Sequence, residues 1–154
     1  MAQASSAKLV LYASVGPELR WYEASVTDAT LEQRGSIRLP ANVQYVWPHA
    51  SRRFLYAATS DSASGMGPAG TNHHVTALRV DPASGKLTWL GSTPTEKQPR
   101  GFNIDPTGRF VVVSGEQSDM ISSYVIDPAT GALKLIGRYP TGKGSNWVEI
   151  VALD

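Results

Sequence analysis

Two segments of this chain repeat each other, and an internal repeat limits the possible folds more than any other sequence feature. Residues 43–58 (VQYVWPHASRRFLYAA) correspond to residues 99–114 (PRGFNIDPTGRFVVVS). Further along, residues 80–91 (VDPASGKLTWLG) correspond to residues 126–137 (IDPATGALKLIG). The first pair of segments is offset by 56 residues and the second by 46. We therefore expect an insertion in residues 60–72, whose small and polar composition is typical of a surface loop.

Each copy of the repeat holds four short stretches rich in β-branched and aromatic residues, separated by turn sequences such as Asp-Pro-Ala-Ser-Gly. Proline with its fixed φ and glycine with its access to positive φ are typical of hairpin turns. No stretch keeps a helical apolar period, so the sequence predicts an all-β chain. A four-stranded unit of about 45 residues has the size of a β-propeller blade. A β-sandwich is the alternative, although it would not require two copies in phase.

We interpret the whole chain as one partial β-propeller of three four-stranded blades, one of which is split between the two ends. Residues 1–40 would supply three strands of the split blade, without its innermost strand. Residues 41–95 would form the second blade and residues 96–141 the third. Residues 142–154 would supply the ring-closing innermost strand, at 146–151.

Three blades cannot curve into a closed ring around a filled channel. Two copies that exchange the C-terminal strand would form a six-bladed ring with two-fold symmetry and would leave no strand edge unpaired. We therefore expect a homodimer in which each C-terminal strand completes the N-terminal blade of the other copy. The alternative is a fragment that aggregates or exchanges strands less regularly.

The composition excludes several classes of function. Lys and Arg number 14 against 13 Asp and Glu, so no basic surface predicts nucleic acid as a partner. No long apolar run is present, and residues 1–8 lack the core of a signal peptide, which favours a cytoplasmic protein without membrane contact. The absence of Cys excludes thiol nucleophiles and thiolate metal sites. Catalysis would use His, carboxylates, Arg or hydroxyls, and we expect no cofactor and no metal.

Three stretches, residues 98–110, 113–119 and 137–148, resemble the last blade and closing strand of the propeller lactonase family. This family includes bacterial 6-phosphogluconolactonases and fungal carboxymuconate cyclases. The part before residue 91 resembles the opening blades of the same family. Its members are seven-bladed and more than twice as long, so the resemblance implies that the middle blades are missing here. Several catalytic positions of the family, including a channel His, would lie in that missing part.

The loops between blades, and those joining the second and third strands of a blade, open on one face of a propeller channel. The repeat places Gln44, Arg100 and Asn146 at equivalent positions near this mouth. Arg100 offers a planar fork to a carboxylate or phosphate, which suits the acidic sugar lactones that the resemblance implies. Its alternative role is structural, binding loop carbonyls. Trp147 either packs between blades or stacks on a sugar.

The candidate catalytic residues are Glu116, His73 and His74, which the same reasoning places around the mouth. Glu116 would activate water, or orient a His, if burial raised its pKa; otherwise it is simply solvated. Neighbouring residues on a strand point to opposite faces, so only one His would face the channel. Two adjacent His residues without a third spaced ligand do not predict a metal site.

Two functions follow from these observations. The first is a lactone hydrolase that acts on an acidic sugar lactone such as 6-phosphogluconolactone, a reaction that needs only general-base help and oxyanion stabilisation. The second is a catalytically inactive, truncated or rearranged propeller that keeps the fold and at most binds a small anion.

Overall fold

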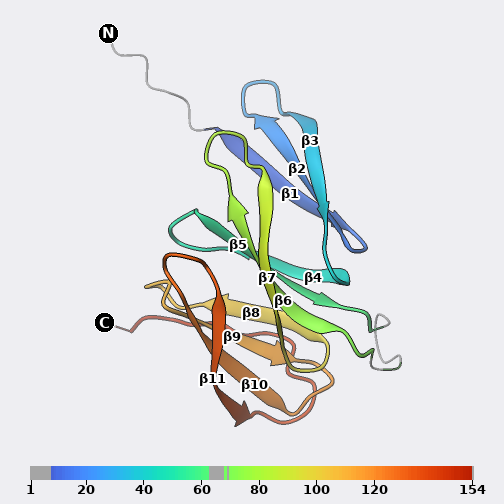
Figure 1. Ribbon diagram of the computed structural model, residues 1–154, viewed down its shortest axis with the longest axis vertical. Helices are drawn as coiled ribbons and strands as arrows, with labels where there is room; N and C mark the ends of the chain where they lie inside the picture. Colours follow the sequence, from blue (N-terminus) through green and yellow to red (C-terminus); the bar gives the residue numbers. More distant parts are fainter. Residues whose placement is uncertain (1–7, 63–67, 69, 154) are drawn as a thin grey trace.

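The computed structural model describes residues 8–62, 68 and 70–153, and every regular element in this part of the chain is a β-strand (Figure 1). The strands form three antiparallel sheets, in which each strand pairs with its neighbours in sequence. The first sheet comprises β1 (Leu9–Val15), β2 (Glu18–Ser25) and β3 (Thr30–Arg38); the middle sheet comprises β4 (Asn42–Pro48), β5 (Phe54–Ser60), β6 (His73–Val80) and β7 (Leu87–Pro94); the last sheet comprises β8 (Pro99–Ile104), β9 (Phe110–Gly115), β10 (Met120–Ile126) and β11 (Leu133–Pro140).

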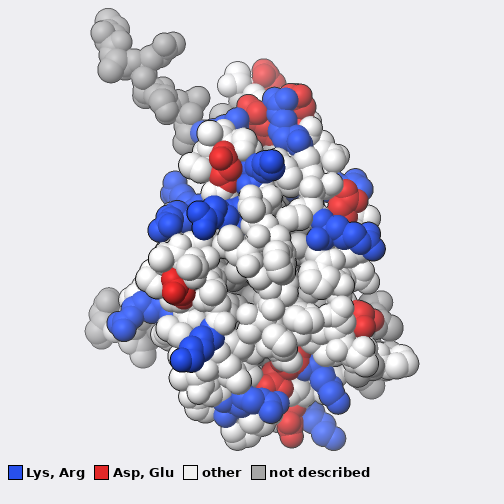
Figure 2. Space-filling view, in the orientation of Figure 1, with Lys and Arg blue, Asp and Glu red and all other residues white. Residues whose placement is uncertain are grey.

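The all-β prediction is confirmed, and three sheets of three or four strands are the arrangement of a partial propeller. The sheets follow one another along the chain and are joined at residues 39–41 and 95–98. No helix in the described ranges is long and apolar enough to cross a membrane. On the face that Figure 2 shows, Lys and Arg lie among Asp and Glu, with a broad uncharged area between the charged groups.

The repeated turns explain how neighbouring sheets lock together. Gly85 and Gly131 end the two Asp-Pro-Ala-Ser/Thr-Gly turns with φ values of +72° and +76°, which an L side chain would strain. Their carbonyl oxygens accept hydrogen bonds from tyrosines of the preceding sheet. Tyr12 donates to Gly85 O over 2.8 Å, and Tyr56 donates to Gly131 O over 2.9 Å. The same turn therefore makes the same contact at both junctions between sheets.

β5 is buried along its whole length because it lies between two apolar cores. Alternate side chains point to opposite faces of a strand, so Phe54 and Tyr56 face the last sheet while Leu55 and Ala57 face the first. The core toward the last sheet also holds Phe102, Val111, Val113, Tyr124 and Ile126; the core toward the first sheet also holds Leu19, Trp21, Leu78 and Leu87. Each large buried side chain stabilises the fold by about 1.5–3 kcal/mol.

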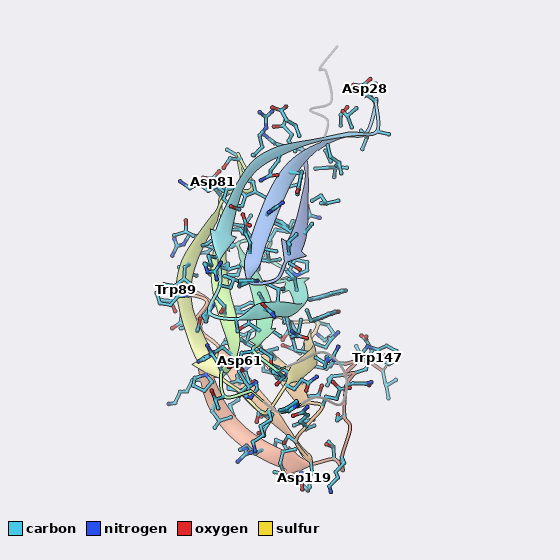
Figure 3. All side chains as sticks on the ribbon, turned by 90° about the vertical axis from the view of Figure 1, so that its right-hand side faces the viewer. Asp28, Asp61, Asp81, Trp89, Asp119 and Trp147 are labelled. Carbon is cyan, nitrogen blue, oxygen red and sulfur yellow. The ribbon has the colours of Figure 1, made fainter. Side chains whose placement is uncertain are left out.

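The sheets stack along a curve, as Figure 3 shows from the side. On the inner side of the curve β4 packs against β8, and β1 and β2 pack against β4. Trp89 of β7 lies on the outer side, whereas Trp147 of the C-terminal segment lies on the inner side. This is the curvature expected of part of a ring, with innermost strands toward its centre.

The insertion and the predicted C-terminal strand are the two predicted segments that lie outside the three sheets for most of their length. Of the insertion at residues 60–72, residues 63–67 and 69 lie outside the described residues, and its two ends are joined by a hydrogen bond from Asp61 N to Asn72 O of 3.2 Å. Residues 141–153 form no strand in the single chain. The ring-closing strand at 146–151 therefore stays a prediction.

Candidate functional site at the channel mouth

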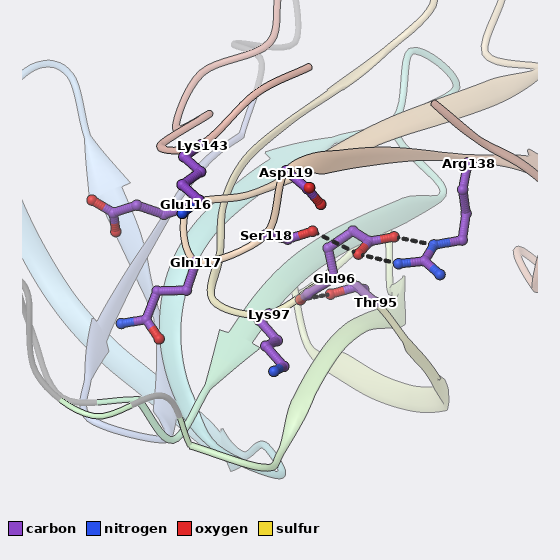
Figure 4. Close-up of a pocket in the computed structure, with 9 residues that line it drawn as sticks. All are labelled: Thr95, Glu96, Lys97, Glu116, Gln117, Ser118, Asp119, Arg138 and Lys143. Carbon is purple, nitrogen blue, oxygen red and sulfur yellow. Dashed lines mark hydrogen bonds and ion pairs between the residues drawn. The ribbon is translucent and has the colours of Figure 1, made fainter. Parts of the chain in front are cut away.

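A cavity of about 670 Å³ opens where two loops, the end of β11 and the C-terminal segment meet (Figure 4). Its walls come from the connection between β7 and β8, the turn between β9 and β10, the end of β11 and the segment that follows β11. The lining residues are Thr95, Glu96, Lys97, Glu116, Gln117, Ser118, Asp119, Arg138 and Lys143. The cavity is therefore built by the two kinds of loop that the propeller interpretation places at the mouth.

Arg100 and Glu116, which the sequence placed at one mouth, form an ion pair there. Arg100 Nε lies 2.7 Å from Glu116 Oε2, and Gln98 Nε2 donates to the same oxygen over 2.8 Å. The side chains of Arg100 and Glu116 are 32% and 30% exposed. β8 carries one extra residue between Pro99 and Phe102 in its pairing with β9, and this bulge includes Arg100. The pair is thus held by a bulged strand but remains open to solvent.

The other predicted binding residues, Gln44, Asn146 and Trp147, are less closely associated with the Arg100–Glu116 pair. Gln44 lies in the equivalent bulge of β4, and its Nε2 donates to Asn42 O over 3.2 Å. Asn146 lies beside Arg100's neighbour Gly101, where a Cβ would stand 2.7 Å from the Asn146 carbonyl oxygen. Trp147 is 76% exposed. The structure therefore brings Asn146 next to the Arg100 strand, and it records no contact of the Gln44 side chain with the Arg100–Glu116 pair.

His73 is buried, and both of its ring nitrogens are occupied. Nε2 lies 2.9 Å from Gly70 O and must donate to it, so Nδ1 is the acceptor nitrogen. Nδ1 lies 3.0 Å from Ser60 Oγ and accepts from Gln98 N over 3.3 Å. His73 thereby ties the insertion to the loop that carries Gln98, and no ring nitrogen is left for a substrate in this conformation. Its catalytic role stays a prediction.

His74 points to the opposite face of β6 from His73, as neighbours on a strand must. Burial lowers the pKa of His74, and its electrostatic interaction with the adjacent His73 ring adds to the effect. Its Nδ1 is buried and has no hydrogen-bond partner among the described residues. Its cross-strand partner is Thr59, whose hydroxyl oxygen is likewise buried and unpartnered. His74 therefore lies away from the Arg100–Glu116 pair, and its catalytic role also stays a prediction.

The sequence did not single out Glu96, which is the most extensively bonded carboxylate of the mouth. Arg138 binds it with two nitrogens, Nε to Oε1 at 2.6 Å and NH2 to Oε2 at 2.7 Å (Figure 4). Ser118 donates to Oε2 over 2.9 Å and Ser122 to Oε1 over 2.6 Å. These hydrogen bonds, led by those of Arg138, hold the pKa of Glu96 at about 2. The only sequence signal was two charged residues, Glu96 and Lys97, between two strands.

Two further cations line the cavity beside this saturated pair. Lys97 lies on the β7–β8 connection and Lys143 on the segment after β11. Within the described ranges neither ammonium group takes part in an ion pair. An anionic ligand in the cavity would therefore meet two ammonium groups without displacing a protein carboxylate from either.

The antiparallel sheets stack along a curve, and polar loops line a cavity beside them. This arrangement defines the chain as a β-propeller protein. Residues 49–150 match the family described as "Lactonase, 7-bladed beta-propeller". The chain belongs to that family, and the resemblance drawn from its motifs is confirmed.

Similar proteins agree with this assignment. The chain is 46% identical over 100 residues to a 6-phosphogluconolactonase of Serratia proteamaculans, covering 65% of this chain and 27% of that protein. It is 41% identical over 102 residues to a 6-phosphogluconolactonase of Pectobacterium carotovorum, covering 66% of this chain and 28% of that protein. The match thus spans little more than a quarter of these relatives.

Solved structures share the fold at lower identity. A putative 6-phosphogluconolactonase from Bacteroides fragilis superposes with a TM-score of 0.78 at 19% identity, over 94% of this chain and 41% of that one. A periplasmic gluconolactonase from Pseudomonas aeruginosa superposes with a TM-score of 0.73 at 22% identity, over 88% of this chain and 37% of that one. At these identities the comparison establishes the propeller fold alone.

Proposed function

We propose that this chain hydrolyses an acidic sugar lactone, such as 6-phosphogluconolactone, at the channel mouth. The observation that carries the proposal is the Arg100–Glu116 ion pair, at 2.7 Å, with Gln98 on the same carboxylate oxygen. It lies in a half-exposed position beside a cavity lined by Lys97 and Lys143. The names of the curated relatives support the substrate class.

The chemistry of the site follows from this arrangement. Both donors bind Glu116 Oε2, so we assign Oε1 as the acceptor of a proton from water. The water oxygen would attack the lactone carbonyl carbon, the ring C–O bond would break, and the departing ring oxygen would take up the proton that Glu116 had accepted from the water. Arg100 would place its terminal guanidinium nitrogens against the acidic group of the substrate. The product would be the open hydroxy acid.

The lysines at the cavity wall would add affinity for the acidic group, because charge-assisted hydrogen bonds are about twice as strong as neutral ones. His73 would act by positioning Gln98, since its Nδ1 accepts from Gln98 N over 3.3 Å. His74 faces the first sheet and takes no part in the proposed reaction. The proposal thus rests on one carboxylate and one guanidinium, with no cofactor.

The test is lactone turnover by the purified chain, corrected for spontaneous opening, compared with Arg100→Ala. Loss of a charged hydrogen-bond donor costs about 1.5–3 kcal/mol, so kcat/KM should fall by about 10- to 100-fold. Arg109→Ala is the matched control, because Arg109 is an exposed arginine in the turn between β8 and β9, at the other end of the same strand. Equal rates for Arg100→Ala and the unaltered chain would remove the proposed site. Retained anion binding without turnover would instead identify an inactive propeller.

A further inference from the structure

Within residues 8–62, 68 and 70–153, the first sheet has a strand edge without a partner. The middle and last sheets each carry an innermost strand, β4 or β8, at the edge of their second strand, β5 or β9. In the first sheet β1 occupies the place of the second strand, and within the described ranges it pairs with β2 alone. Its outward side chains are apolar: Leu9, Leu11 and Val15 are 45%, 39% and 61% exposed. An apolar strand edge of this kind is a template for pairing with another chain.

The C-terminal segment has the properties of the missing strand. Val148 and Ile150 are half-buried, whereas their neighbours Trp147, Glu149 and Val151 are exposed, so the segment has the alternation of a strand. The segment follows β8 in the same direction. Trp147 and Asn146 meet Gly101, and Glu149 Oε1 lies 3.4 Å from Asn103 Nδ2.

The C-terminal segment lies beside β8 in the way that β8 lies beside β4. Innermost strands of neighbouring blades run parallel around a channel, and Tyr45 of β4 meets Phe102 of β8 with ring centroids 5.1 Å apart. In the repeat Gly101 is equivalent to Tyr45 and Val148 to Phe102, and Gly101 meets Asn146 and Trp147, which immediately precede Val148. The segment therefore lies where the innermost strand of the next blade belongs, and the described residues provide no strand on its other side.

The segment cannot reach β1 of its own chain without loss of the core. The first and last sheets lie at opposite ends of the molecule, with the middle sheet between them (Figure 1). The first sheet is held to the middle sheet by Leu19 and Trp21, which are buried against Leu55 and Leu78. Pairing within one chain would expose these side chains, at a cost of about 1.5–3 kcal/mol for each.

We propose that a second copy of this chain docks at the C-terminal segment, so that the segment pairs with the partner's β1 while the partner's segment pairs with β1 here. The two ends are complementary within the described residues: the first sheet has three strands without an innermost strand, and the segment after the last sheet lies in the position of an innermost strand alone. Two such exchanges are related by a two-fold axis and close a six-bladed ring.

The two complete blades specify the register of the exchange. Val46 pairs with Ala57 in the middle sheet, and the equivalent Phe102 pairs with Val113 in the last sheet. The equivalent pair in the split blade is Val148 with the partner's Ala13. Both side chains would then point to the same face of the completed blade. The exchange also covers exposed apolar residues on the outer face of the last sheet, such as Phe110, Val125 and Tyr139, which are 37%, 40% and 51% exposed.

The exchange has a consequence for the channel mouth. In the last sheet the innermost strand sets Arg100 beside the β9–β10 turn, which carries Glu116. The equivalent arrangement in the split blade sets Asn146 beside the partner's β1–β2 turn. The mouth would therefore be completed by residues of both copies.

Cysteine pairs test the partner and the register together, because the chain has no cysteine of its own. Ala13→Cys and Val148→Cys are made as separate variants, mixed under conditions that allow subunits to exchange, and oxidised. Paired residues on adjacent strands have Cα atoms about 4.5–5.5 Å apart, which suits a disulfide. The mixture should give a covalent species of twice 16.5 kDa on a non-reducing gel. Each variant alone should give none.

The matched control replaces Ala13→Cys by Ser14→Cys, which shifts the register by one residue and points to the opposite face. This second mixture should give far less of the covalent dimer on the non-reducing gel. A third variant carries Ala13→Cys and Val148→Cys in one chain. Consumption of its thiols at a mass of 16.5 kDa would show pairing within the chain and overturn the proposal. A monomeric mass for the unaltered chain by light scattering would overturn it as well, whatever the activity of the protein.

Discussion

Glu96 and Glu116 line the same cavity but differ in how fully their oxygens are bonded. Glu96 accepts hydrogen bonds from Arg138, Ser118 and Ser122, and its side chain is 5% exposed. Glu116 accepts from Arg100 and Gln98 on one oxygen only, and its side chain is 30% exposed. A carboxylate whose lone pairs are filled by protein donors fixes the loops around it. One that keeps lone pairs and solvent access can exchange a proton or meet a substrate.

Replacing Glu96 should have the largest effect on stability. Glu96→Ala removes the acceptor of a buried serine hydroxyl, that of Ser122, and the partner of Arg138. Hydrogen bonds to charged groups contribute about 1.5–3 kcal/mol, and the exposed Arg138 adds little to this. We expect the free energy of unfolding to fall by about 3 kcal/mol in urea titrations. Glu116→Ala is the control and should lose about 1 kcal/mol or less. Equal losses for the two variants would contradict the distinction between the carboxylates.

Acid should reveal the same distinction with a smaller effect. The folded pKa of Glu96, about 2, lies below the 4.5 that is usual for a glutamate side chain, so its contribution is complete above pH 4.5 and is lost as the pH falls toward 2. Because Arg138 is 55% exposed, we discount the shift for solvent screening and expect about 2 kcal/mol. Unfolding free energies of the unaltered chain and of Glu96→Gln should therefore converge with acid. Parallel curves would show that Glu96 does not titrate in this way. Other carboxylates contribute to both proteins and cancel in the difference.

The repeat predicted the strands because its information is local. The Asp-Pro-Ala-Ser-Gly and Asp-Pro-Ala-Thr-Gly turns specify hairpins through proline and glycine, and the structure has β7 and β11 following them. The Arg100–Glu116 pair could also be expected at one mouth, since both positions follow from the blade order. The partners of His73 could not, because Gly70 belongs to the insertion, which has no counterpart in the second copy of the repeat.

The Glu96–Arg138 pair could not be predicted from the sequence, because it depends on a β-bulge. The pairing of β10 with β11 shifts between Ser123 and Tyr124, and this bulge sets Arg138 opposite Ser122. Without the extra residue Arg138 would pair with Ile121 and point to the other face of the sheet. A bulge of one residue thus decides whether the guanidinium meets Glu96, and a period-two pattern does not predict where a bulge occurs.

Glu116→Gln should have the smallest effect on stability and a large effect on turnover. The amide keeps the shape of the side chain and one carbonyl acceptor for Arg100, and water reaches the position, so we expect the unfolding free energy to change by about 0.5 kcal/mol or less. The amide cannot take a proton from water, and loss of a general base costs about 10²- to 10⁴-fold in kcat. Glu96→Gln is the matched comparison, because the same change of one atom at a buried carboxylate should cost stability instead. If Glu116→Gln destabilised the chain as much as Glu96→Gln does, Glu116 would be a structural tie like Glu96, and the proposed base would have to be sought elsewhere.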